Sequence, residues 1–280
     1  MGMRGLTWAS IEVAPQPPRE VLGQLLGGYR RIPVLQMGAH FYCDTRLAFE
    51  SLYAEDPACT DLTADDETLR DWAEREIFFA VFSVVSPVRV ARFLYRRFGV
   101  AGVWRFVRDR TQMMRDSTVV VLPPERAREV VQEFIAGLSL SLSSRRYLSG
   151  GSPGYLDLCC YHPLWMASQI DPRLMSSWPL SVLQWMKRIN SLGHGEQLEG
   201  AWERVFEDIA QGQKAFSGTV TEPYEVGEPV GVAPSDYARD ETCGSLVHID
   251  PRRVVISRAL QSGDVIYLHF PPSGLDLRRL

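Results

Sequence analysis

The sequence predicts an α+β protein with more than one domain. Short β-prone runs lie near the start of the chain, at 9–13, 32–36 and 40–43, and again between 229 and 271. The stretch from 68 to 213 instead carries apolar residues at helical spacing. With 280 residues, of which 45% are hydrophobic and 23% charged, the chain is long enough for two domains and a small addition.

Changes in composition along the chain predict three domains. They cover residues 1–56, 66–214 and 218–280. The polar, acidic stretch from 55 to 68 is typical of a linker, and after Gly218 short alternating strands separated by Gly and Asp turns become frequent. We therefore expect an incomplete α/β domain, an all-α domain and a small β-barrel-like domain, in that order.

Charge and cysteine content argue against several classes of function. The net charge of −4 does not favour a nucleic-acid partner, and the basic run at 94–97 is interpreted as a solvated helix face. No apolar run approaches the roughly 20 residues of a membrane helix, and no signal peptide is visible. Five cysteines are an odd number without metal spacing, which favours a reducing cytoplasm.

A proline-led hairpin followed by a helix start carries the most specific signal. Residues 32–36 are apolar and β-prone, and Pro33 stands at the beginning of the run, where no ladder N–H is lost. A tight turn and a second short strand at 40–43 follow. Asp44 or Thr45 can then cap a helix, because its side-chain oxygen accepts from the free N–H groups of the first turn.

This segment resembles the second half of the thioredoxin-like domain of glutathione transferases. There, a strand that begins with a cis-proline leads through a hairpin to an acidic–hydroxyl pair at the next helix. The resemblance implies that the backbone of Ile32, before Pro33, holds the cysteinyl part of glutathione. It implies that Asp44 and Thr45 hold the γ-glutamyl part, and a helix N-terminus suits a carboxylate. The alternative is that Pro33 is only a strand-edge proline and Asp44 and Thr45 only a helix cap.

The family's first strand and first helix have no counterpart in the sequence. They would lie before Gly5, and their loop carries the Ser, Cys or Tyr that activates the glutathione sulfur. Without this strand, the strands near Ile11 and Val34 each lose a ladder partner. Three explanations stay open: a misplaced start codon, direct pairing of the two flanking strands, or a strand supplied by a partner. No catalytic residue is assigned.

The helical stretch resembles the all-α domain of the same family, with six or more helices expected between 68 and 213. Asp157 matches a buried structural aspartate at the start of the family's core helix, but Gly154 stands where a Ser or Thr cap is expected. The run 161–165 is similar to bacterial and fungal transferases. His162 within it is expected to be a buried packing residue.

The C-terminal run His269–Gly274 is similar to an HFPR-x-G ending found in one branch of the family. Pro272 replaces the arginine, so an anion-binding role at that position is lost or moved. His248 and His269 have no carboxylate or cysteine partner in the pattern, and no metal is predicted. Cys43, beside the expected glutathione site, is expected to pack within its strand.

Two functions of different classes are predicted. The first is a glutathione transferase-like enzyme that conjugates or adds glutathione to a small hydrophobic electrophile. The second is a catalytically defective binding or assembly module. Glutathione-assisted isomerisation or cyclisation in small-molecule biosynthesis would use the same site and stays open. The resemblance further implies a cytoplasmic protein and a homodimer, with glutathione as cosubstrate.

Overall fold

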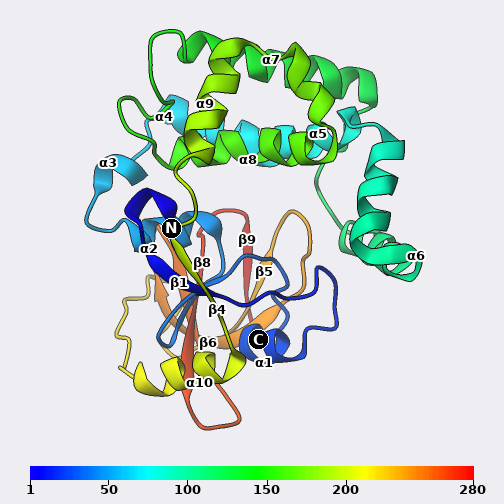
Figure 1. Cartoon of the computed structure of the whole chain (residues 1–280). Coiled ribbons are helices and arrows are strands. Elements are labelled where there is room, and N and C mark those ends of the chain that lie inside the picture. The colour runs from blue at the N-terminus through cyan, green and yellow to red at the C-terminus, as the bar shows by residue number, and fades with distance from the viewer. The chain divides into compact units, whose positions relative to one another are not determined.

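The chain forms two compact units, each built from several segments (Figure 1). The computed structural model describes residues 1–280, except for the side chains of residues 57 and 58. The helical unit contains residues 1–8, 53–104 and 120–198, and the sheet unit contains residues 9–52, 105–119 and 199–280.

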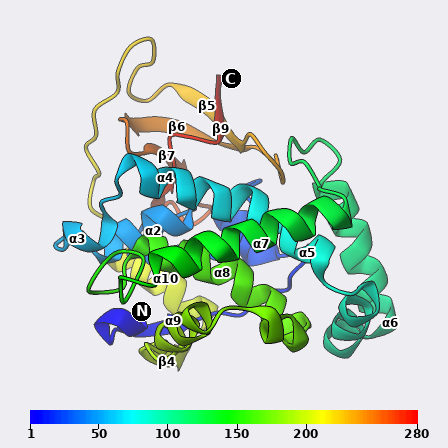
Figure 2. The ribbon, with the colours of Figure 1, turned by 90° about the horizontal axis from the view of Figure 1, so that it is seen from above.

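The helices of the helical unit pack around one apolar core (Figure 2). In α7 (Pro124–Ser141), buried side chains recur every three or four residues from Ala127 to Leu138, so one face of the helix is apolar. Pro124 stands at the start of this helix, where its missing N–H costs nothing. The other elements are α3 (Pro57–Thr60), α4 (Ala64–Asp71), η2 (Trp72–Ile77), α5 (Phe78–Val84), α8 (Tyr155–Ile170), η3 (Pro172–Ser177) and α9 (Leu180–Asn190), after a first turn η1 (Gly2–Arg4).

α6 (Pro87–Met113) is a long helix that bends at Gly99. The φ of 64° and ψ of 179° at Gly99 are open to glycine but strained for other residues. The backbone is not helical at this residue, so α6 consists of two helical segments joined at Gly99. Within the part of the chain that the structure describes, no single helix is long and apolar enough to cross a membrane. Residues 64–84 and 87–113, bent by 97°, meet the criteria of length and composition only as a pair.

Asp157 is the central polar group of the helical unit and is fully buried. Its Oδ1 accepts from the Leu148 N–H at 2.8 Å and from the Trp185 indole N–H at 2.7 Å. Its Oδ2 accepts from the N–H groups of Ser149 and Gly154, each at 3.1 Å. The expected structural aspartate is therefore observed, with Gly154 at the N-cap of α8.

The sheet unit contains a seven-stranded sheet with the strand order β2-β3-β8-β7-β6-β5-β9. β3 runs parallel to β8, with His40 opposite Tyr267 and Tyr42 opposite His269, and the other neighbouring strands are antiparallel. Its strands are β2 (Leu35–Met37), β3 (His40–Tyr42), β5 (Pro229–Pro234), β6 (Thr242–Ile249), β7 (Val254–Ala259), β8 (Val265–Phe270) and β9 (Leu275–Arg279).

Two helices contribute to the core beside this sheet. Leu25 and Leu26 of α1 (Glu20–Leu26) and Ile209 of α10 (Trp202–Gln211) are fully buried with the apolar side chains of the strands. The side-chain amide of Gln36 in β2 donates to the backbone oxygen of Val205 in α10 at 3.0 Å. This bond holds the outermost strand against the helix.

The structure groups the terminal segments differently from the separate domains expected at 1–56 and 218–280. Strands from both ends of the chain share one sheet and one apolar core. The C-terminal strands therefore continue the sheet beyond β3 rather than form a separate β-barrel-like body. The physical reason is that β3 has a second edge, whose backbone groups need partners that β8 supplies. Of the predicted helical domain at 66–214, residues 105–119 and 199–214 belong to the sheet unit.

β1 (Thr7–Ser10) is the strand expected at 9–13, and it pairs with β4 (Glu196–Glu199) in a separate two-stranded sheet. The Gly200 N–H donates to the Ser10 oxygen at 2.9 Å. Because β1 and β2 belong to different sheets, the direct pairing of the two flanking strands is not observed.

Replacing Asp157 with Ala should destabilise the helical unit by roughly 3–5 kcal/mol, because four donors, three of them buried, lose their acceptor. Urea unfolding followed by circular dichroism measures the loss. Asp157→Asn should lose less, since one carbonyl oxygen remains. The exposed Glu133→Ala serves as control and should change the stability little. A loss below about 1 kcal/mol for Asp157→Ala would contradict the assigned role.

Candidate functional site

Asp44 caps the helix that follows the hairpin, α2 (Thr45–Leu52). Its Oδ1 accepts from the N–H groups of Arg46 at 2.8 Å and Leu47 at 3.3 Å. Thr45 is exposed at the first helical position. Of the two residues expected to cap this helix, Asp44 is therefore the one that does so, and these bonds fix the orientation of its carboxylate.

Ile32 and Pro33 lie at the same end of the hairpin as Asp44. The peptide bond between them is cis, and both residues are exposed, Ile32 at 46%. In the hairpin Leu35 is paired with Tyr42, so Pro33 precedes the ladder by two residues and Asp44 follows it by two. The short hairpin turns at Gly38, which has a φ of 60°, and so brings Asp44 back to the end of the hairpin at which Pro33 lies.

Tyr29 connects the segment before Pro33 to the end of β3. Its buried hydroxyl donates to the backbone oxygen of Cys43, and its N–H donates to Thr242 Oγ1 at 2.8 Å. Cys43 itself donates its N–H to the His269 oxygen at 2.9 Å. Burial, followed by the Asp44 charge, raises the pKa of the Cys43 thiol far above its usual range. Cys43 therefore packs as a protonated thiol, in agreement with the prediction.

Arg31 joins this site to the loop between β5 and β6. Its guanidinium donates to the Asp236 carboxylate and to the Tyr237 backbone oxygen, and its Cζ lies 4.0 Å from the centre of the Tyr237 ring. The Arg31 Nε is buried and has no hydrogen-bond partner among the residues that the structure describes. A cation with an unused donor therefore lies one residue before Ile32.

Tyr237 shares the electrostatic environment of Asp44. Burial is the main reason that the pKa of Tyr237 is raised, and the negative charges of Asp236 and Asp44 raise it further. Arg31 and Arg110 oppose this shift in the pKa. The Tyr237 hydroxyl is therefore protonated at neutral pH and can act as a hydrogen-bond donor.

Sequence reasoning missed Arg31, Asp236 and Tyr237. It predicted only short strands and turns after Gly218, because nothing in the local pattern indicates that this loop meets Arg31, 205 residues away from Asp236. Arg30 makes a similar long-range contact with Asp109. A run of two arginines before a strand-leading proline is the only sequence signal, and it does not identify the acidic partners.

Comparison with known proteins is informative at the level of structure. No protein-family model matches this chain, and no curated protein sequence matches it. A solved structure, however, does match this chain. The chain is similar to a GST-like protein from Pseudomonas syringae, with 25% sequence identity and a TM-score of 0.76. The match covers 100% of this chain and 92% of that protein. The chain therefore has a GST-like fold over its whole length.

A cluster of histidines and aromatic rings lies where β3 meets β8. His40 Nδ1 is 2.9 Å from His269 Nε2, and the His269 ring stacks on Tyr42 at 4.5 Å. Phe216 contacts both histidine rings and also His248. Sequence reasoning singled out His248 and His269 but not His40. Among the described residues, no group of three or more His, Cys, Asp or Glu side chains is arranged to hold a metal ion.

Two features of the helical unit do not extend the site. His162 was expected to be buried, but it is exposed on α8 and stacks on Phe78 at 5.5 Å. The residues 150–154 fit the pattern G-x-S-x-G, but the nearest preceding element is the helix α7, and Ser152 is exposed. A serine nucleophile on a sharp turn requires a strand before it, so this segment does not form such a turn.

The pH dependence of stability should report on His269. Burial is the main cause that lowers the pKa of His269 to about 3, and His40, Arg253 and His248 lower this pKa further. The unfolded chain takes up a proton at this residue near pH 6.5, whereas the folded chain does not. Stability should therefore fall as the pH drops from 6.5 toward 3, with a loss of about 2 kcal/mol from this residue at pH 5.

His269→Asn should remove this part of the acid sensitivity. The test compares the difference in unfolding free energy between pH 7 and pH 5 for the two proteins, by urea denaturation. The exposed His194→Asn should keep the wild-type difference. Equal differences in the wild type and in His269→Asn would show that the buried ring is not neutral.

Proposed function

We propose that the chain binds glutathione at the end of the hairpin, between Ile32, Pro33, Asp44 and Thr45. The observation that carries the proposal is the end-to-end similarity to a GST-like protein, at a TM-score of 0.76. The hairpin register supports it, because Pro33 and Asp44 leave the ladder at the same end.

The chemistry of Asp44 suits one end of the tripeptide. Two helix N–H groups hold its carboxylate, so its negative charge is fixed in place and can pair with the γ-glutamyl ammonium. The N-terminus of α2 adds a partial positive charge for the neighbouring carboxylate of the same γ-glutamyl group. The exposed Thr45 hydroxyl can donate to that carboxylate.

The segment before Pro33 suits the rest of the ligand. The exposed Ile32 leaves its backbone open to the cysteinyl part, which would pair with it as a short strand. Arg31, one residue before Ile32, adds a positive charge near the site, which its ion pair with Asp236 partly offsets. With glutathione held there, the activity that we propose is addition of its sulfur to a small hydrophobic electrophile.

A second candidate function, a glutathione-binding module without catalysis, is favoured by the burial and existing contacts of two groups near the site that could otherwise contact a bound thiol. Transferase chemistry requires a lowered thiol pKa in the bound glutathione. The Cys43 thiol and the Tyr29 ring are buried, and burial raises the pKa of both groups. Tyr29 also donates its hydroxyl to Cys43. For the enzyme, we propose that the protonated Tyr237 hydroxyl stabilises the thiolate by hydrogen bonding.

Titration calorimetry with glutathione tests the binding site. Asp44→Ser keeps an oxygen that can cap α2 but removes the charge, so stability should stay near the wild-type value while affinity falls on the order of 10–100-fold. The matched control is Asp61→Ser, at an exposed position. Equal affinity of Asp44→Ser and the wild type, or no binding by the wild type, would contradict the assignment.

Conjugation of chlorodinitrobenzene separates the two candidate functions. If the chain is an enzyme, Tyr237→Phe should lower kcat on the order of 10–100-fold, because a hydrogen bond to the thiolate is lost, and should leave glutathione affinity largely unchanged. Glutathione binding by the wild type without turnover would favour the module.

A further inference from the structure

A pocket of about 600 Å³ lies in the helical unit beside the first half of α6. Four arginines and one aromatic ring of α6 line one side, and the end of α8 with the residue that begins η3 lines the other. The lining residues from α6 are Arg89, Arg92, Phe93, Arg96 and Arg97, and those from the other side are Gln169, Ile170 and Pro172. This space falls within the range typical of sites for small molecules.

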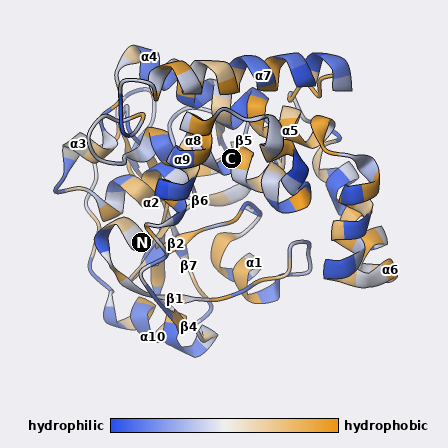
Figure 3. Cartoon of the chain, turned by 45° about the horizontal axis from the view of Figure 1, so that its top comes forward, coloured by the Kyte–Doolittle hydropathy of each residue, from blue (hydrophilic) through white to orange (hydrophobic). Residues whose placement is uncertain are grey.

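The spacing of the arginines concentrates positive charge on one face of the helix. Arg89, Arg92 and Arg96 follow one another at intervals of three and four residues, which places them above one another. Figure 3 shows hydrophilic bands along α6 that alternate with apolar ones. Like charges at these intervals repel and destabilise the helix. The arrangement is therefore unfavourable to folding unless an anion offsets it.

Of these arginines, Arg89 alone has an acidic partner among the side chains that the structure describes. Arg89 Nε lies 3.1 Å from Asp171 Oδ2, and Arg173 Nε lies 3.3 Å from the other oxygen of the same carboxylate. Arg92, Arg96 and Arg97 make no hydrogen bond or ion pair within the described part of the chain. One buried carboxylate is shared by two guanidinium groups, so three positive charges in the pocket lack a counter-charge.

Except for Gln169, the remaining lining is apolar and complements this charge. Phe93 is 38% exposed in the middle of the arginine face, and Ile170 and Pro172 lie across the pocket. Planar guanidinium groups match the oxygen geometry of a phosphate, and several of them can share its two negative charges. An exposed ring within the same concavity offers a surface for an aromatic or aliphatic group.

We propose that this pocket binds an organic phosphate, a phosphomonoester with an apolar body. The phosphate contacts Arg92, Arg96 and Arg97, and the apolar body lies against Phe93, with Gln169 available to donate to a phosphate or ester oxygen. A nucleic acid is disfavoured, because the positive charge is confined to a concavity in a chain of net charge −4. The proposal is independent of the glutathione site, which lies in the other unit.

Binding of phenyl phosphate, measured by titration calorimetry at low salt on the full chain, tests the proposal. Phenyl phosphate should bind, inorganic phosphate should bind at least tenfold more weakly, and phenol should not bind detectably. The affinity for phenyl phosphate should fall with rising salt. Equal affinity for phenyl phosphate and inorganic phosphate would overturn the role of Phe93, and failure of phenyl phosphate to bind would overturn the site.

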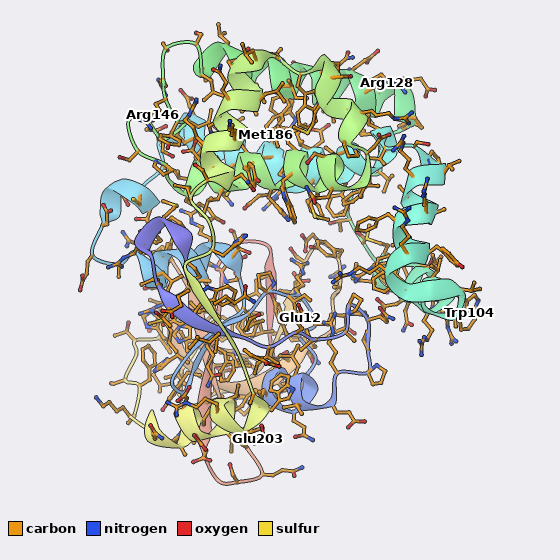
Figure 4. The ribbon with its side chains drawn as sticks, in the orientation of Figure 1. Glu12, Trp104, Arg128, Arg146, Met186 and Glu203 are labelled. Carbon is orange, nitrogen blue, oxygen red and sulfur yellow. The ribbon has the colours of Figure 1, made fainter. Side chains whose placement is uncertain are left out.

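A pair of variants locates the site. Arg92→Gln with Arg96→Gln should weaken phenyl phosphate binding at least tenfold and raise the thermal stability of the free protein, because the repulsion is relieved. The matched control is Arg145→Gln with Arg146→Gln, which removes the same charge from exposed positions. Arg146 is labelled in Figure 4 at the end of the helical unit away from α6. Equal weakening by both pairs would overturn the pocket in favour of a general charge effect.

A second experiment, with lipid vesicles, distinguishes a soluble ligand from a lipid headgroup with the same chemistry. Sedimentation with phosphatidylcholine vesicles that contain phosphatidic acid is compared for the wild type and both pairs of variants. Binding in solution with no sedimentation assigns a soluble phosphomonoester. Sedimentation of the wild type without binding of phenyl phosphate would overturn the small-molecule pocket, since Trp104, labelled on α6 in Figure 4, is 62% exposed and would serve a membrane surface.

Discussion

The parallel pairing of β3 with β8 is the interaction on which the sheet unit depends. It joins residues 40–42 to residues 267–269, so the two ends of the chain meet in one sheet. Backbone bonds extend the pairing at both ends, from the Tyr267 N–H to the Ala39 oxygen and from the Cys43 N–H to the His269 oxygen, each at 2.9 Å. Without β8, the second edge of β3 would expose unpaired backbone groups.

This pairing also positions the candidate site. Cys43 is held by β8 on one side and by the Tyr29 hydroxyl on the other, and the next residue is Asp44, whose carboxylate caps α2. The loop that contributes Asp236 and Tyr237 follows β5 of the same sheet. Arg31 connects that loop to the segment before Pro33. The charged groups around the hairpin end therefore lie on segments that flank the strands of one sheet and that contact one another.

The local features of this site could be predicted from the sequence, because each depends on neighbouring residues. The turn at Gly38 and the cap at Asp44 follow from short patterns whose physics is complete within a few residues. The buried Asp157 of the helical unit was instead expected from the resemblance to a family, and its contact with Trp185 joins residues 28 positions apart. The pairing of β3 with β8 could not be predicted. Both strands are short and apolar, and such strands carry no information about their partner or register until the whole sheet is assembled. The contacts of Arg31 with Asp236 and Tyr237 could not be predicted for the same reason.

The apolar periodicity that predicted the helical unit also gives no information about the role of the arginines of α6. A solvated helix face and a binding face have the same composition, and only the position of α8 decides between them. Gln169, Ile170 and Pro172 close the space beside the arginines and turn an exposed row of charges into a concavity. Residues at such a face add little to packing, and three like charges oppose the helix that carries them. Local stability therefore does not explain why arginines occupy these positions. Arginines that line a cavity large enough for a small molecule are expected where ligand binding, rather than folding, requires them.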